Sequence, residues 1–187
     1  MKKILIISSS IRTGRKSNRV GYYFRNYLLR EKIAEPIMAD LAEYNFPLFE
    51  ERLKYTPDPP QNLLDWASAV KNADGIILIT PEYNGGYPAS LKNAIDVLYE
   101  EWEHKPVAIV TVSSGNFGGT QVITSLQFTL FKMKARTVTA MYPVPNIEKA
   151  FDENGKAQNQ EATDKRTEVF IRELMWTINT QDLAVKD

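Results

Sequence analysis

Short apolar runs alternate along the chain with longer stretches whose apolar residues recur at helical spacing. Five such runs are bounded by polar or turn-forming residues, and three of the five are rich in Ile, Leu and Val, which is typical of strands buried in a parallel sheet. The five runs cover residues 3–8, 35–41, 75–80, 107–112 and 136–142. We expect the run at 35–41 to be the weakest strand, and Pro143 and Pro145 to end the fifth.

Amphipathic stretches that follow these runs predict five helices. They cover residues 20–28, 63–70, 89–98, 122–133 and 169–178. The helix at 122–133 is apolar on more than one face, so we expect it to be buried or to pack on a partner. Residues 146–160 are expected to form a polar connection.

Strands that alternate with helices predict an α/β fold of three layers, with one doubly wound, five-stranded parallel sheet between two layers of helices. The expected strand order is 2-1-3-4-5, which makes the first and third strands neighbours where the order reverses. A chain of 187 residues is long enough for one such domain and short for two. We see no linker or internal repeat, so residues 1–187 are expected to form a single domain.

Three polar or glycine-rich loops follow the first, third and fourth strands. We call residues 9–19 the first loop, 81–88 the second loop and 113–120 the third loop. Ligands of open α/β sheets bind at the carboxyl ends of the strands, where these loops must converge. Taken alone, the second loop fits a ligand site and a tight turn with solvent-facing tyrosines about equally well.

The first loop combines hydroxyls and cations with the start of a helix. Backbone N–H groups at a helix N-terminus favour an anion. Ser10 and Ser17 can add O–H donors, and Arg12 and Arg15 can add charge-assisted hydrogen bonds. We therefore predict a phosphate site, with a solvated basic loop as the alternative. The loop matches neither the P-loop nor the GxGxxG pattern, which argues against a Rossmann dinucleotide site.

Composition excludes several classes of chemistry. The chain has no cysteine, which rules out disulfides, thiolate nucleophiles, iron–sulfur clusters and thiolate zinc sites. His104 is the single histidine and no GxSxG is present, so neither a serine hydrolase nor a histidine-rich metal site is expected. What remains is chemistry carried by an organic cofactor, or none. A phosphate at the first loop and a flat ring between the other two suggest a mononucleotide.

Charge and hydropathy bound the partners and the compartment. Lys and Arg total 23, as do Asp and Glu, so the net charge of zero gives no electrostatic case for nucleic acid or an anionic membrane. No apolar run approaches the roughly 20 residues that span a bilayer. The apolar run at 4–7 is too short for a signal peptide. We expect a cytoplasmic protein that binds neither nucleic acid nor membrane.

Three sequence blocks resemble those of the NADPH-dependent FMN reductases, flavodoxin-like flavoproteins that include azoreductases and quinone or chromate reductases. The blocks are Ser10-x-Arg12-x-x-Arg15, Pro81-Glu82-Tyr83-Asn84 followed by Leu91-Lys92-Asn93-Ala94-Ile95-Asp96, and Ser114-Gly115-x-x-Gly118-Gly119. The resemblance runs from about residue 3 to about residue 142, and its most specific part is the middle block.

The resemblance implies bound FMN and a cosubstrate, NADPH or NADH. The FMN phosphate would be held by Ser10, Arg12, Arg15, Ser17 and Asn18. The isoalloxazine ring would lie along Pro81, Glu82, Tyr83 and Asn84, with Ser113, Ser114, Gly115, Gly118 and Gly119 at its other edge. Whether Tyr87 covers part of the ring stays open.

The resemblance also implies a homodimer or homotetramer, built through the helices that follow the second and third loops. In the first of these helices, Leu91, Ile95 and Leu98 offer an apolar stripe beside that of 122–133.

The leading hypothesis is an oxidoreductase that passes electrons from NADPH or NADH, through FMN, to a quinone, azo compound, metal oxyanion or free flavin. Such a protein needs no acid or base of its own, because the cofactor supplies the chemistry. One alternative is a flavodoxin-like electron carrier without nicotinamide turnover, although such carriers are usually strongly acidic. Another is a regulatory module that binds a mononucleotide.

Overall fold

A twisted parallel sheet forms the centre of the molecule in the computed structural model, which describes residues 1–184. Its strands are β1 (Lys3–Ser8), β2 (Glu35–Asp40), β3 (Gly75–Pro81), β4 (Pro106–Val112), β5 (Arg136–Thr137) and β6 (Tyr142–Val144). The order is β2-β1-β3-β4-β5, with β6 also paired to β4, and every pair is parallel. The predicted order 2-1-3-4-5 is therefore confirmed.

The fifth predicted strand is wrong in its detail. The run at 136–142 gives two short strands, β5 and β6, and Pro143 lies inside β6 instead of ending the strand. Both pieces pair with the same edge of β4, and Pro143 is opposite Thr111. Within the described residues, β6 has no strand on its other side. A proline is tolerated on such an edge strand because its missing N–H faces away from the ladder.

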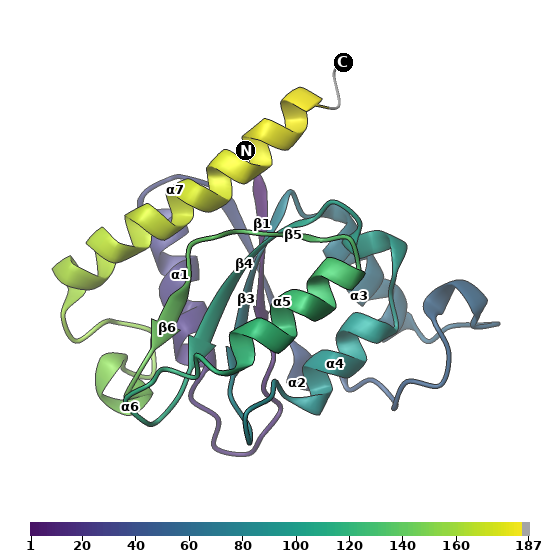
Figure 1. Cartoon of the computed structure of the whole chain (residues 1–187), viewed down its shortest axis with the longest axis horizontal. Coiled ribbons are helices and arrows are strands. Elements are labelled where there is room, and N and C mark those ends of the chain that lie inside the picture. The colour runs from purple at the N-terminus through teal and green to yellow at the C-terminus, as the bar shows by residue number, and fades with distance from the viewer. Residues whose placement is uncertain (185–187) are drawn as a thin grey trace.

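The helices cover both faces of the sheet (Figure 1). One face carries α1 (Asn18–Arg30) and α7 (Gln160–Ala184), and the other carries α3 (Gln61–Asn72), α4 (Ala89–Asp96) and α5 (Val122–Lys132). Short helical segments are α2 (Leu41–Tyr44), α6 (Ile147–Ala150) and the 3₁₀ turns Leu53–Tyr55 and Glu100–Trp102. Among the described residues, no helix combines the length and hydropathy needed to cross a bilayer.

Alternate residues of each central strand supply two separate cores, as the period of a strand requires. In β1, Ile4 and Ile6 pack towards α1 and α7, whereas Leu5 and Ile7 pack towards α3 and α4. All four side chains are fully buried. The near-continuous apolar sequence of β1 thus follows from helices on both sides.

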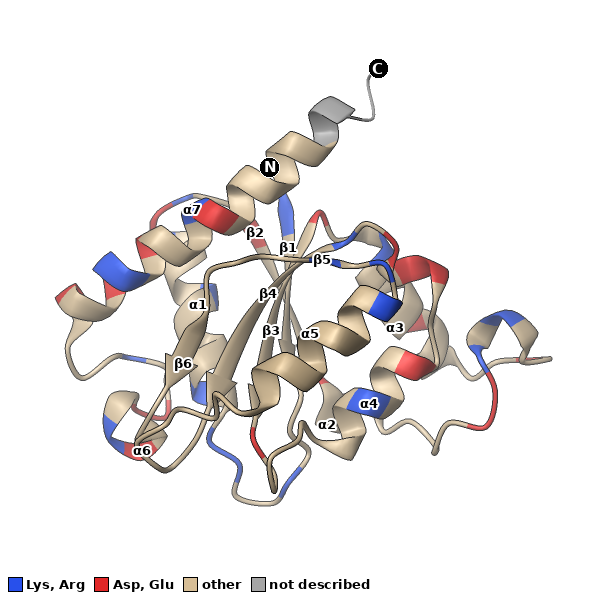
Figure 2. Ribbon diagram, viewed as in Figure 1, with Lys and Arg blue, Asp and Glu red and all other residues tan. Residues whose placement is uncertain are grey.

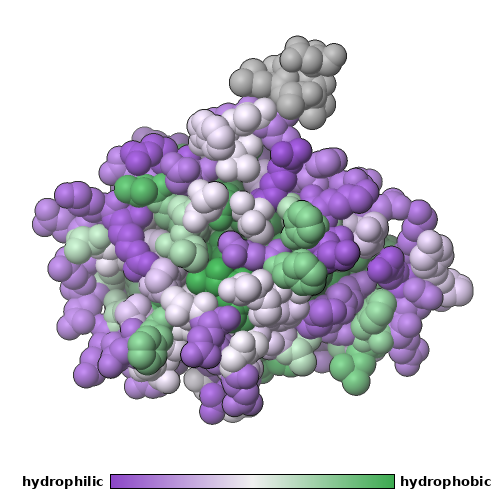
Figure 3. Space-filling model, in the orientation of Figure 1, coloured by the Kyte–Doolittle hydropathy of each residue, from purple (hydrophilic) through white to green (hydrophobic). Residues whose placement is uncertain are grey.

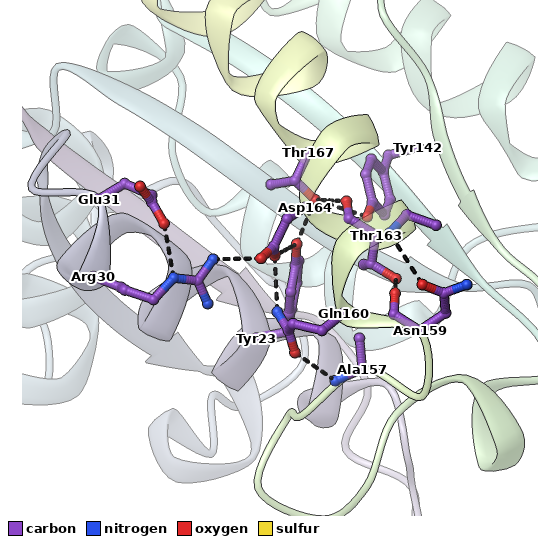
Figure 4. A network of polar contacts seen from close by, with 11 residues as sticks. Tyr23, Arg30, Glu31, Tyr142, Ala157, Asn159, Gln160, Thr163, Asp164 and Thr167 are labelled. Carbon is purple, nitrogen blue, oxygen red and sulfur yellow. Dashed lines mark hydrogen bonds and ion pairs between the residues drawn. The ribbon is translucent and has the colours of Figure 1, made fainter.

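The long helix α7 is joined to α1 and β6 by a partly buried polar network (Figure 4). The Tyr23 hydroxyl lies 2.8 Å from the Asp164 carboxylate and 2.7 Å from the Thr167 hydroxyl. Thr167 also meets the Tyr142 hydroxyl at 2.9 Å, and Arg30 pairs with Asp164 at 2.7 Å. The network fixes the final helix across the sheet.

Candidate functional site

The three loops converge at the carboxyl edge of the sheet, the lower edge in Figure 1. Together with the start of α6 they surround a cavity of about 440 Å³, a size that suits a small organic ligand. Nine of the predicted site residues line it: Ser10, Arg12, Arg15, Ser17, Pro81, Glu82, Tyr83, Ser113 and Ser114. The topology thus brings together residues that are more than 100 positions apart in the sequence.

Two predicted residues of the first and second loops do not line the cavity. Asn18 is the first residue of α1, and Asn84 is exposed at the tip of the second loop. There Asn84 and Gly85 have φ of 53° and 81°, and Tyr83 and Gly86 exchange backbone hydrogen bonds of 2.8 and 3.1 Å. This is the geometry of a type I′ turn. The second loop is therefore a tight turn whose first half also lines the cavity.

The glycines of the third loop shape it from outside the cavity. Gly118 and Gly119 have φ of 63° and 73°. A Cβ at Gly118 would lie 2.9 Å from that of Pro143, and one at Gly119 would lie 3.0 Å from the Val112 carbonyl oxygen. Gly115 has open space around it and does not line the cavity either. Glycine is thus required where the loop packs on β4 and β6.

Sequence reasoning missed one wall of the cavity. Ile147 and Glu148 of α6 line it, although residues 146–160 were expected to be a polar connection. Ile147, Ala150 and Phe151 stand at helical spacing, which was the available signal. Other lining residues that were not predicted are Thr13, Gly14, Lys16 and Val112. Lys16 pairs with Glu148, and this hydrogen bond lowers the pKa of the Glu148 carboxyl group.

Tyr87, whose position was left open, does not reach the cavity. Its hydroxyl lies 2.8 Å from that of Thr129 on α5, and its ring packs against the core under α4 and α5. The side chain therefore anchors the second loop to a helix and does not contribute to the cavity wall.

Cations gather at the end of the cavity formed by the first loop, seen as blue segments at the lower edge of Figure 2. They differ in their partners. One Arg15 nitrogen lies 2.5 Å from the Asp40 carboxylate and another 2.6 Å from the Ser10 carbonyl oxygen. Arg12 is exposed, and its guanidinium has no hydrogen-bond or ion-pair partner within the described part of the chain. Arg12 is thus the cation that remains available to a ligand.

Hydrogen-bond donors face the same end. Ser17 is 4% exposed, lines the cavity and stands at the N-cap of α1, but its side chain does not cap the helix. Its Oγ has no partner among the described residues, which is costly for a buried hydroxyl. The N–H groups of Arg19 and Val20 already donate to the carbonyl oxygens of Lys16 and Ser17. The Ser17 hydroxyl is therefore the unsatisfied donor at the start of α1, and an anion there would satisfy it at the positive end of the helix dipole. The residues present therefore fit a phosphate group.

The other end of the cavity lies between the second and third loops. Pro81 and Glu82 form one side, and Val112 and Ser113 form the other. The Glu82 carboxylate accepts a hydrogen bond of 3.3 Å from the N–H of Gln121, next to the start of α5. Tyr83 reaches back to the first loop, where its hydroxyl lies 2.6 Å from that of Ser10. The cavity is suited to bind a molecule with an anionic end. Among the described residues that line it, no serine hydroxyl is hydrogen-bonded to a histidine or a carboxylate.

Comparison with known proteins assigns the chain to a family. Residues 2–149 match the model of the family described as NADPH-dependent FMN reductase. An NAD(P)H-dependent FMN reductase of Schizosaccharomyces pombe is 34% identical over 148 residues, which cover 74% of this chain and 70% of that protein. One of Saccharomyces cerevisiae is 32% identical over 150 residues, which cover 73% of this chain and 77% of the relative.

Among solved structures, the flavoenzyme NAD(P)H:(acceptor) oxidoreductase FerB of Paracoccus denitrificans superposes with a TM-score of 0.76. The alignment covers 95% of this chain and 97% of that one at 20% identity, and it confirms the flavodoxin-like fold. The chain therefore belongs to the NADPH-dependent FMN reductase family of oxidoreductases, whose members use FMN and NAD(P)H.

Proposed function

We propose that this chain passes electrons from NADPH or NADH, through FMN bound in the cavity, to a small-molecule acceptor. The observation that carries the proposal is the buried Ser17 hydroxyl at the start of α1, which has no partner among the described residues. Arg12 lines the same cavity and is also unpaired within that part of the chain. Both groups can bind an anion. The same cavity continues between the second and third loops, where a flat ring can bind.

Each part of the cavity has a separate task in this proposal. Ser10, Ser17 and Arg12 would hold the phosphate, at the positive end of the α1 dipole. Pro81, Glu82 and the backbone of Tyr83 would hold the isoalloxazine ring on one side, and residues 112–114 would hold it on the other. Bound FMN supplies the redox chemistry, by taking two electrons from a nicotinamide nucleotide and passing them on. The chain itself binds and orients, which agrees with its lack of cysteine and its single histidine.

We propose acceptors of the quinone, azo, metal-oxyanion or free-flavin class. Named relatives support the first two. A quinone reductase of Escherichia coli is 37% identical over 90 residues, which cover 46% of this chain and 45% of that protein. An NADPH azoreductase of a Bacillus species is 30% identical over 138 residues, which cover 73% of this chain and 72% of the relative.

The test is cofactor binding followed by anaerobic reduction. We expect purified protein to be yellow, with roughly one FMN per chain, and to bleach when NADPH or NADH is added without oxygen. A panel of acceptors would then restore the colour at different rates and identify the acceptor class. A colourless protein that takes up no FMN from excess would refute the proposal. Tight FMN that neither nucleotide reduces would point to the electron carrier instead.

We also propose that the chain forms a homodimer or homotetramer through α5. Phe128 and Phe131 on this helix are 64% and 71% exposed, and Figure 3 shows apolar surface over α5. Large apolar patches are uncommon on monomers. The stripe expected at Leu91, Ile95 and Leu98 does not contribute, because all three side chains are buried in the core of the chain itself.

Light scattering tests the oligomer. We expect a mass of at least two 21.3 kDa chains at micromolar concentration, and a shift to single chains in Phe131→Glu. Leu29→Glu is the matched control, because Leu29 is 50% exposed on α1, on the opposite face of the sheet. A monomeric wild type, or equal dissociation in both variants, would contradict an interface at α5.

A further inference from the structure

The phenol of Tyr83 lies at the end of the cavity where the first loop stands. Its oxygen is 2.6 Å from the Oγ of Ser10, the only hydrogen bond that its side chain makes within the described residues. This distance is at the short end of the range for O–H···O hydrogen bonds. Tyr83 was expected to lie along a ring, mostly through its backbone. Its side chain instead joins the second loop to the first loop.

Ser10 has a limited number of hydrogen-bonding positions. A serine hydroxyl donates one hydrogen bond and accepts two. Its Oγ accepts from the N–H of Arg12 at 3.4 Å, and Arg15 holds its carbonyl oxygen at 2.6 Å, so the residue is fixed in place. If the phenol of Tyr83 donates to Ser10, both acceptor positions of Oγ are occupied. The hydroxyl hydrogen of Ser10 is then free to point into the cavity.

A phosphate in the cavity would select this direction of donation. Phosphate oxygens accept hydrogen bonds, so the neighbouring hydroxyls gain most when each donates towards the anion. Hydrogen bonds in such a chain strengthen one another, because each donor polarises the next. The phenol is also a stronger acid than an aliphatic hydroxyl, and therefore the better donor of the pair.

We propose that Tyr83 is a positioning residue for the cofactor phosphate: it donates to Ser10 and turns the Ser10 hydroxyl towards the anion. The inference rests on the proposed function, since it takes FMN as the ligand. It assigns to Tyr83 a role at the phosphate end of the cavity, which is distinct from contact with the ring. It predicts that the phenol oxygen affects only those ligands that carry the phosphate.

Tyr87 provides a matched control in the same loop. Its hydroxyl makes one comparable hydrogen bond, 2.8 Å to Thr129, but on α5 and outside the cavity. Tyr83→Phe and Tyr87→Phe therefore remove the same atom from the same loop. Only the first of them removes a partner of Ser10.

The experiment titrates wild type and both variants, freed of flavin, with FMN and with riboflavin, and follows flavin fluorescence. We expect Tyr83→Phe to weaken FMN about three- to tenfold, the loss that corresponds to one hydrogen bond. Riboflavin affinity should not change in either variant, and FMN affinity should not change in Tyr87→Phe. A double-mutant cycle adds Ser10→Ala, in which Tyr83→Phe should cause no further loss.

Three results would overturn the inference. FMN affinity equal to wild type in Tyr83→Phe would show that the phenol does not act on the phosphate. Equal losses of FMN and riboflavin would place Tyr83 at the ring or in the support of the loop. Additive effects of Tyr83→Phe and Ser10→Ala would remove Ser10 as the link. Failure of the proposed function looks different. If the cavity is not a flavin site, wild type itself binds neither flavin, and the inference falls with it. If wild type binds FMN but neither nucleotide reduces it, the proposed reductase activity fails while the titrations still test the role of Tyr83.

Discussion

Replacement of Arg12 or Arg15 by alanine should weaken FMN for two different reasons. The first loop presents both cations to the cavity, but Arg12 is unpaired within the described part of the chain and Arg15 is held by Asp40 and by the Ser10 carbonyl oxygen. Arg12→Ala removes a cation that is free to bind the phosphate. Arg15→Ala removes a residue that holds the loop together.

The magnitude for Arg12 follows from one charge-assisted contact. A hydrogen bond to a charged group contributes about 1.5–3 kcal/mol, which corresponds to roughly a ten- to hundredfold change in Kd. Arg12 is exposed, so salt screens part of this interaction, with a Debye length of about 8 Å at physiological ionic strength. We expect the loss to lie near tenfold at that ionic strength and to grow as salt is removed. The stability of the flavin-free protein should hardly change.

Arg15→Ala should affect both binding and stability. The side chains of Arg15 and Asp40 are only 19% and 12% exposed, which places the pair between exposed ion pairs and buried ones. We expect a loss of roughly 1–3 kcal/mol in the free energy of unfolding. The unpaired Asp40 carboxylate would also repel the phosphate. Adding Asp40→Asn should therefore recover part of the FMN affinity, since the remaining amide oxygen can still accept from the N–H of Ala42 at the N-cap of α2.

Flavin fluorescence titration with FMN and riboflavin is the assay, and urea denaturation measures stability. Riboflavin lacks the phosphate, so its affinity should not change in Arg12→Ala. Arg25→Ala is the control, because it removes an exposed arginine from the outer surface of α1. FMN binding equal to wild type in Arg12→Ala would refute this role and make the first loop a solvated basic loop. Equal losses of FMN and riboflavin in Arg12→Ala would also refute it, because Arg12 would then support the ring or the fold.

Three further predictions concern stability, each measured by denaturation. Tyr23→Phe should lose about 1–2 kcal/mol, because it removes the hydroxyl that joins Asp164 to Thr167. Burial raises the pKa of Tyr23 above the usual value near 10. Above about pH 10 only the unfolded chain ionises this group, so folding stability should fall as pH rises. The fall should be shallower in Tyr23→Phe. Gly155 has φ of 80°, and a Cβ there would lie 2.4 Å from the Tyr23 backbone nitrogen, so Gly155→Ala should lose more than about 2 kcal/mol. Gly14→Ala is the control. A Cβ there meets no atom within 4 Å, so the loss should be only the left-handed penalty of about 1–2 kcal/mol. A stable Gly155→Ala, an unchanged alkaline slope or a neutral Tyr23→Phe would each contradict the packing described for α1 and α7.

Periodicity predicted the parts of the fold that depend on burial alone. The runs at 3–8, 75–80 and 107–112 are apolar at nearly every position because helices cover both faces of the sheet, and all three are central strands. The strand predicted at 136–142 was wrong in its detail because this segment lies at the edge of the sheet. At the edge of the sheet the chain pairs with β4, leaves it and pairs again as β6, and a proline can take part. A rule that ends strands at proline holds for central strands and fails at an edge.

The site was predictable as a set of loops but not as a set of contacts. Position after a parallel strand places residues at one edge of the sheet, so the loops converge whatever their side chains do. The direction in which each side chain points depends on the local backbone and on neighbours from elsewhere in the chain. The turn at Asn84 and Gly85 sends Tyr83 towards Ser10 and Tyr87 towards α5. No spacing in the sequence separates these two tyrosines.

The same reasoning explains why the two arginines looked equivalent. Both stand in the first loop and both line the cavity. The difference arises from β2, which pairs with β1 so that Asp40 lies opposite Ser8, the last residue before the loop. Strand order 2-1 at this edge therefore places one carboxylate beside the loop, and Arg15 is the cation that reaches it. A shift of one residue in this register would turn the Asp40 side chain to the other face of the sheet. Arg15 would then be unpaired, and the first loop would present two free cations to a ligand instead of Arg12 alone.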